Sequence, residues 1–236
     1  MTTARESRLA TFQPPQGVEK YATVFAHAPH LAAREAKYSR KLCADLEDAV
    51  RRCGLKSGMT ISFHHAFREG DRTINAVVAR LAEMGLKDLT LASSSLLSCN
   101  FPLIEHIKSG VIRRIYTSGM RGKLANAISH GLMDVPVQVH SHGGRVHLMD
   151  TGELQVDVAF LGVSSSDEYG NSNGVSGHSH CGALGYAMVD AARAKTVVLL
   201  AEEMAPYPNM PASIRQDQVD WIVKVDQIGD ASAISV

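Results

Sequence analysis

The sequence predicts an α/β fold, an open and mostly parallel sheet with helices on both faces. Strand-sized apolar runs alternate along the chain with stretches whose apolar residues recur at helical spacing. This alternation is typical of parallel strands joined by helical crossovers. The chain has 236 residues, of which 45% are hydrophobic, so the core can be large. We expect residues 1–38, which contain Pro14, Pro15 and Pro29, to form an N-terminal arm, and residues 39–236 to form the α/β domain.

Glycines mark the ends of the first two predicted helices. Five apolar residues between Leu42 and Cys53 fall on one helical face, and Gly54 follows where a C-cap glycine would stand. A second apolar stripe runs from Ile74 to Met84 and stops before Gly85. The remaining predicted elements are strands at 59–63, 88–92, 112–117, 135–139, 156–163, 196–200 and 221–225, and helices at 103–108, 123–130 and 184–192.

The composition argues against nucleic acid and membrane partners. Lys plus Arg and Asp plus Glu both number 24, so no net charge attracts a polyanion or an anionic surface. No apolar run approaches the roughly 20 residues of a membrane helix, and the first residues lack the apolar segment of a secretory signal. The four cysteines are scattered and form no C-x-x-C pair, which favours free thiols in a reducing cytoplasm.

Polar residues and glycines follow four of the predicted strands, where ligands bind in open parallel sheets. One of these loops contains the serines at 93–95. The candidate substrate-binding residues in the other three loops are His64, His65, Arg68, Arg145, Asp167, Glu168 and Asn171. For any single loop, ordinary turn chemistry is the alternative, because turns use the same residue types.

The loop after residue 139 contains the candidate catalytic group. Gly143 and Gly144 let a ligand approach the backbone, and their N–H groups could stabilise a carbonyl oxygen that becomes an oxyanion. His142 beside them is the third member of the candidate catalytic group, and we expect it to hydrogen-bond either the substrate or the backbone. Arg145 could hold a carboxylate or phosphate in a bidentate fork, and a surface salt bridge is the alternative for it.

We consider the histidine clusters as a metal site and a glycine-rich turn as an anion site. His140, His142 and His147 cluster, as do His178, His180 and Cys181, but no third ligand has tight spacing, so we predict no metal. A glycine-rich turn then precedes a predicted helix and could bind an anion or pyrophosphate at the helix N-terminus, although a simple helix start is equally compatible. The candidate cofactor-binding residues in this turn are Ser176, Gly177 and Gly182.

Several of these segments resemble the citrate lyase alpha chain family. The similar blocks cover residues 58–68, 118–122, 140–147, 156–162, 167–171 and 206–208, and the likeness runs from about Leu42 to Val236. The block Asp167-Glu-Tyr-Gly-Asn171 and the region 122–146 also resemble, more distantly, the first subunit of the acid CoA-transferases.

The resemblance implies a CoA-transferase-like fold and a cytoplasmic citrate CoA-transferase subunit that exchanges acetyl for citryl on an acyl-carrier thioester. It implies a beta chain and a gamma acyl carrier chain as partners, citrate and acetate as reactants, and no tightly bound cofactor. The substrate would be an acyl thioester of CoA or of the carrier's CoA-like prosthetic group.

In related CoA-transferases the reactive glutamate lies in a second half of the chain, which does not match any part of residues 1–236. We therefore expect these residues to be inactive alone and to form an oligomer. Two alternatives stay open: a non-catalytic assembly or carrier-docking module, and a sugar-phosphate isomerase-like or effector-binding domain.

Overall fold

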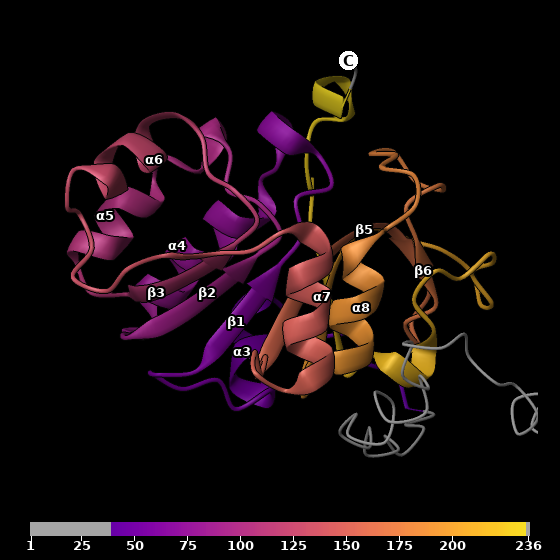
Figure 1. The fold of residues 1–236 in the computed structure, drawn as a ribbon. Coiled ribbons are helices and arrows are strands. Elements are labelled where there is room, and N and C mark those ends of the chain that lie inside the picture. The colour runs from indigo at the N-terminus through magenta and orange to yellow at the C-terminus, as the bar shows by residue number, and fades with distance from the viewer. Residues whose placement is uncertain (1–38, 235–236) are drawn as a thin grey trace, which may run out of the picture.

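One eight-stranded sheet organises the molecule (Figure 1). The computed structural model describes residues 39–234. The strand order is β4-β3-β2-β1-β5-β7-β8, and all neighbours in this series are parallel. A short strand, β6, pairs with β5 in antiparallel orientation. The strands are β1 (Thr60–Phe63), β2 (Leu89–Ser93), β3 (Ile112–Thr117), β4 (Gln138–Val139), β5 (Val158–Ser166), β6 (Ser172–Asn173), β7 (Thr196–Met204) and β8 (Trp221–Lys224). The predicted α/β fold is confirmed.

Helices cover both faces of this sheet. The α-helices are α3 (Leu46–Arg52), α4 (Thr73–Glu83), α5 (Leu103–Lys108), α6 (Gly122–Ser129), α7 (His142–Thr151) and α8 (Tyr186–Arg193). The 3-10 turns are η1 (Arg68–Gly70), η2 (Ser98–Asn100), η3 (Gln216–Gln218) and η4 (Ala231–Ile234). Figure 1 shows α7 and α8 side by side on one face, and α4, α5 and α6 behind the sheet. No helix within residues 39–234 is long and apolar enough to cross a membrane.

Two apolar cores separate the sheet from its helices. Alternate residues of β5 point to opposite faces of the sheet. Phe160 belongs to the core that includes residues of α3, α4 and α5, and Leu161 belongs to the core that includes residues of α7 and α8. The second core contains many alanines, among them Ala159 and Ala187, so α8 can lie close to the strands. Every residue of β2 and β5 is buried, as expected for parallel strands covered on both faces.

Local signals account for the helix ends. The Asp45 side chain accepts the amide hydrogen of Asp48 and caps α3. Gly54 and Gly85 follow α3 and α4 with φ of 66° and 79°, the left-handed conformation that glycine adopts without strain. Both predicted glycine stops are therefore confirmed. The predicted N-terminal arm, residues 1–38, lies outside the described residues.

The largest departure from the predicted elements is α7. The sequence predicts a strand-end loop at residues 140–145, but His142 begins a ten-residue helix. Ser141 Oγ accepts the amide hydrogen of Gly144 at 2.9 Å, and Gly152 ends the helix with φ of 81°. This capping outweighs the low helix propensity of two adjacent glycines. Smaller departures concern the strands: β4 is shorter than predicted, β5 and β7 extend further, and β6 was not predicted.

Candidate active site

A cleft opens at the carboxyl ends of the central strands. Strand order runs outward in both directions from the β1–β5 pair, which makes this pair the topological switch point where open α/β sheets bind ligands. The cleft has a volume of about 230 Å³. It is lined by His64, His65, Ala66, Ser94, His142, Cys181, Ala183, Leu184, Gly185 and Tyr186. Loops after β1 and β2 and the N-terminal ends of α7 and α8 thus converge on one site.

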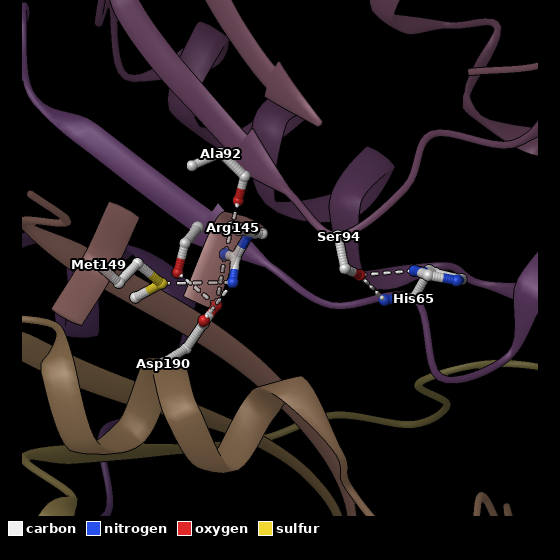
Figure 2. A network of polar contacts seen from close by, with 7 residues as sticks. His65, Ala92, Ser94, Arg145, Met149 and Asp190 are labelled. Carbon is white, nitrogen blue, oxygen red and sulfur yellow. Dashed lines mark hydrogen bonds and ion pairs between the residues drawn. The ribbon is translucent and has the colours of Figure 1, made fainter. Parts of the chain in front are cut away.

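His65 and Ser94 join the ends of β1 and β2. The Nδ1 atom of His65 lies 2.5 Å from Ser94 Oγ, and the His65 backbone N–H donates to the same oxygen at 3.2 Å (Figure 2). Burial, followed by the nearby His142 and Arg68, lowers the pKa of His65. The imidazole is therefore held in its neutral form, with its orientation fixed by the serine hydroxyl.

His64 is more deeply placed. Burial, followed by the neighbouring His65, lowers its pKa to about 4, and a hydrogen bond with the Gly162 backbone opposes the change. Its Nε2 atom is buried and has no hydrogen-bond partner within residues 39–234. The cleft wall therefore contains an imidazole that is neutral near pH 7 and has one ring nitrogen uncommitted.

His142 and Tyr186 are the first residues of α7 and α8. Their rings stack at a centroid distance of 5.1 Å with 30° between the planes, and the His65 ring lies 6.3 Å from that of His142. Sequence reasoning placed His142 in the site but missed Tyr186. The available signal was its position after Gly182 and Gly185, at the start of an amphipathic stripe.

The two candidate oxyanion donors differ in the structure. The amide of Gly144 donates to Ser141 Oγ and is committed to the helix cap. Gly143 is exposed in the first turn of α7, and no atom lies within 4 Å of the position that its Cβ would occupy. Neither glycine is among the residues that line the cleft, although His142 directly before them is. First-turn amides have no acceptor inside the helix, so Gly143, next to His142, is the better placed of the pair to donate to a ligand.

Arg145 binds a carboxylate of the protein itself, whereas the sequence predicts that it binds a carboxylate or phosphate of the substrate. Its side chain is 2% exposed, and Nη1 and Nη2 donate to the two carboxylate oxygens of Asp190 at 2.6 and 2.9 Å (Figure 2). The bidentate face of the guanidinium is therefore occupied inside the fold, and the surface salt bridge considered as its alternative is wrong as well. We assign Arg145 to the architecture of the site instead of to a substrate carboxylate.

Arg68 also lies outside the cleft lining. It is exposed in η1 and has a φ of 48°, an uncommon conformation for a residue with a side chain. The carbonyl oxygen of Arg68 accepts a weak hydrogen bond from Cys99 Sγ at 3.5 Å.

The Asp167–Asn171 segment is a self-contained turn after β5. The Asp167 carboxylate accepts hydrogen bonds from the backbone amides of Tyr169, Gly170, Asn171 and Asn209 and from the Asn171 side chain. Asn171 also bonds Gln216 through both ends of its amide. Glu168 forms an exposed ion pair with Arg40 at 2.8 Å. None of the three predicted residues lines the cleft, and turn chemistry accounts for the contacts of Asp167 and Asn171.

Only one of the three residues of the predicted anion-binding turn lies beside the cleft. The backbone N–H of Ser176 donates to Asn173 Oδ1, and Gly177 packs so tightly on β5 that a Cβ there would lie 2.3 Å from the Ser164 carbonyl oxygen. Gly182 lies next to the cleft residues Cys181 and Ala183. Burial raises the pKa of the Cys181 thiol to about 11, so this sulfur is protonated near pH 7. Within residues 39–234, no three His, Cys, Asp or Glu side chains are arranged to hold a metal ion.

The fold of residues 39–234 is that of the CoA-transferases. Glutaconate coenzyme A-transferase from Acidaminococcus fermentans superposes with a TM-score of 0.58 over 78% of this chain and 75% of that one, at 14% identity, which shows the fold alone. The family model described as "Citrate lyase, alpha subunit (CitF)" matches residues 39–236. The chain therefore belongs to the citrate lyase alpha subunit family.

Relatives of known name agree with this assignment. The citrate lyase alpha chain of Klebsiella pneumoniae is 64% identical over 221 residues, which is 94% of this chain and 44% of the relative. The Escherichia coli K12 alpha chain is 64% identical over 200 residues, 85% of this chain and 39% of the relative. A Streptococcus mutans crystal structure, assigned as the alpha subunit of citrate lyase in complex with citrate, has a TM-score of 0.82 at 50% identity and covers 84% of this chain and 39% of that one. The chain thus spans less than half the length of these relatives.

Proposed function

We propose that this chain contributes to the citrate CoA-transferase activity of a citrate lyase, which exchanges acetyl for citryl on an acyl-carrier thioester. The observation that carries the proposal is a cleft at the switch point of a chain that belongs to the alpha subunit family. A relative with 50% identity has been crystallised with citrate, which supports citrate as the substrate here.

The exchange requires two acyl transfers. A citrate carboxylate oxygen bonds to the acetyl carbonyl carbon and the carrier thiolate leaves, which gives a mixed anhydride. The thiolate then bonds to the citryl carbonyl carbon, and acetate leaves with the anhydride oxygen. Each step places negative charge on a carbonyl oxygen. The Gly143 amide, at the positive end of α7, is suited to stabilise this charge.

The neutral histidines suit hydrogen bonding with the polar groups of citrate. His65 is oriented by Ser94, and His64 has a ring nitrogen without a partner in the described residues. We assign them, together with His142 and Tyr186, to binding the substrate on this wall of the cleft. A CoA or carrier thioester is the acyl donor, with no tightly bound cofactor.

The proposal includes the partners that such an enzyme needs. These are a citrate lyase beta chain and a gamma acyl carrier chain in a cytoplasmic, oligomeric complex. Related CoA-transferases carry their reactive glutamate in a second half, so we also propose that residues 1–236 alone do not complete the exchange.

Citrate binding and acetate release test the proposal together. Calorimetry of this chain should show heat of binding with citrate and none with ribose 5-phosphate. With acetyl-CoA as carrier surrogate and citrate, the longer Klebsiella pneumoniae chain should release acetate faster than this chain at equal concentration. Binding of ribose 5-phosphate alone would instead support the isomerase-like alternative, and binding of the acyl carrier without citrate would support the docking module.

A matched pair of glycine substitutions tests the cleft itself. Gly143→Val places a side chain in the open space over the α7 amide and should obstruct the approach of citrate, which should weaken citrate binding at least about tenfold, a loss of about 1.4 kcal/mol. Gly119→Val is the control, because Gly119 also has no atom within 4 Å of its Cβ position but lies in the loop after β3, whereas Gly143 directly follows the cleft residue His142. Equal citrate affinity of both variants would remove Gly143 from the site.

A further inference from the structure

The ion pair of Arg145 and Asp190 joins α7 to α8 below the cleft. The two side chains are 2% and 0% exposed, and two parallel hydrogen bonds of 2.6 and 2.9 Å connect the guanidinium to the carboxylate. Figure 2 shows the contact between Arg145 and Asp190, with Met149 beside it. A bidentate pair fixes the orientation of both groups as well as their distance.

The same network reaches the two central strands. Ser62 Oγ in β1 donates to Asp190 Oδ2 at 2.9 Å, and Arg145 Nη2 makes a longer bond of 3.4 Å to the carbonyl oxygen of Ala92 in β2. Each strand continues into the cleft two residues later, β1 at His64 and β2 at Ser94.

In α7 and α8, too, the residue of the ion pair lies close in sequence to a residue that lines the cleft. Arg145 lies three residues after His142, and Asp190 lies four residues after Tyr186, so each charged residue is about one turn below a cleft residue. The four elements that form the cleft are therefore tied together at one buried point, immediately behind the residues that line it.

A second ion pair joins the same helices at their other ends. Arg193 Nε lies 2.7 Å from Asp150 Oδ1, with side chains 25% and 41% exposed. This pair has one contact and no strand partner among the interactions found in residues 39–234, and it involves no cleft residue. The pair of Arg193 and Asp150 can therefore serve as a control for substitutions in the buried pair.

We propose that Arg145 and Asp190 form a positioning pair that holds His142 against Tyr186 and so shapes the cleft. Buried ion pairs add little net stability, because desolvation offsets most of their attraction. Apolar residues of similar size would fill the space, but they would not fix the rotation of one helix against the other. The expected effect on citrate rests on the proposed function, whereas the effect on the two rings does not.

The test replaces the network by apolar side chains and reads the ring contact directly. In the variant Ser62→Ala/Arg145→Met/Asp190→Leu the three polar side chains are removed together, and the Ala92 carbonyl loses only the long bond of 3.4 Å, so folding should be retained. Nuclear magnetic resonance, with the His142 signal assigned through His142→Gln, should show loss of the ring-current shift and of the cross-peak between His142 and Tyr186. The control Arg193→Met/Asp150→Leu should keep both.

An unchanged ring contact in the folded triple variant would overturn the positioning role. If the triple variant does not fold, Arg145→Lys gives the same reading, because it keeps the charge and loses the fork. Citrate affinity is measured in parallel: it should fall at least severalfold in the triple variant and stay unchanged in the control. If the wild-type protein does not bind citrate, the proposed function fails, and the ring contact still decides the positioning role.

Discussion

Two loops at the carboxyl ends of neighbouring strands have opposite designs. After β5, the Asp167 carboxylate accepts five hydrogen bonds from its own turn and from Asn209. After β1, His64 keeps a buried nitrogen without a partner in the described residues, and His65 lines an open cleft. A loop that satisfies its polar groups internally supports the fold, whereas a loop that leaves them unsatisfied has capacity for a ligand.

The strongest test of this contrast removes the Asp167 carboxylate. Asp167→Ala leaves several buried amide donors without an acceptor and should lower the free energy of unfolding by more than about 3 kcal/mol. Urea denaturation measures it. The control is Glu168→Ala, which breaks only the exposed pair with Arg40 and should change stability by less than about 1 kcal/mol. Equal losses in the two variants would contradict the structural role of Asp167.

The second test concerns the buried imidazole of His64 in the loop after β1. The pKa of His64 is about 4 in the folded protein and ordinarily 6.5, so the unfolded chain binds more protons between these values. The stability supplied by this group is therefore present above pH 6.5 and is lost as the pH falls toward 4. Between pH 7 and pH 5 the loss should be about 2 kcal/mol.

His64→Gln isolates this contribution from that of Asp71. Burial raises the Asp71 pKa to about 6, so this carboxyl stabilises the folded state as the pH falls below that value and opposes His64. The variant should consequently lose less stability than the wild type between pH 7 and pH 5, as followed by urea denaturation at both pH values. Parallel pH profiles would mean that folding does not lower the pKa of His64.

The smallest effect is expected at the glycine pair of α7. Gly143→Ala meets no atom within 4 Å and should raise the free energy of unfolding by about 0.5 kcal/mol through helix propensity. In Gly144→Ala the new Cβ would lie 3.0 Å from Ser141 Oγ, which should cancel this gain. A thermal unfolding series compares them. A destabilised Gly143→Ala would show that this position needs glycine for the fold and not for access to its amide.

The fold was predictable because helical stripes and strand-sized apolar runs alternate with few exceptions. Helix α7 was missed because adjacent glycines look like a loop, although Ser141 as a cap and the spacing of Arg145 and Met149 were available signals. The cleft was predictable only in part. His64, His65 and His142 follow strand ends and do converge, whereas Asp167 and Asn171 follow a strand end and do not. Residue types were alike in the two cases, and only tertiary contacts distinguish them.

The buried ion pair of Arg145 and Asp190 was also only partly predictable from the sequence. Asp190 lies among the alanines of an apolar stripe, and a lone carboxylate on such a face implies a buried cation. Nothing in the sequence indicated that this cation is Arg145, 45 positions earlier. Pairings over such separations follow from helix packing, which local patterns do not encode.

The absence of charged side chains from the part of the cleft wall formed by residues 39–234 determines how ligand binding there depends on salt concentration. Within residues 39–234, no lysine or arginine lines the cleft, and Arg145 beneath it is neutralised by Asp190. Carboxylates on this side therefore meet uncharged hydrogen-bond donors, whose contacts act at close range. Dissolved ions screen attraction between separated charges over about 8 Å under physiological conditions and weaken direct hydrogen bonds far less. The contribution of this wall to citrate affinity should consequently change little when salt is added.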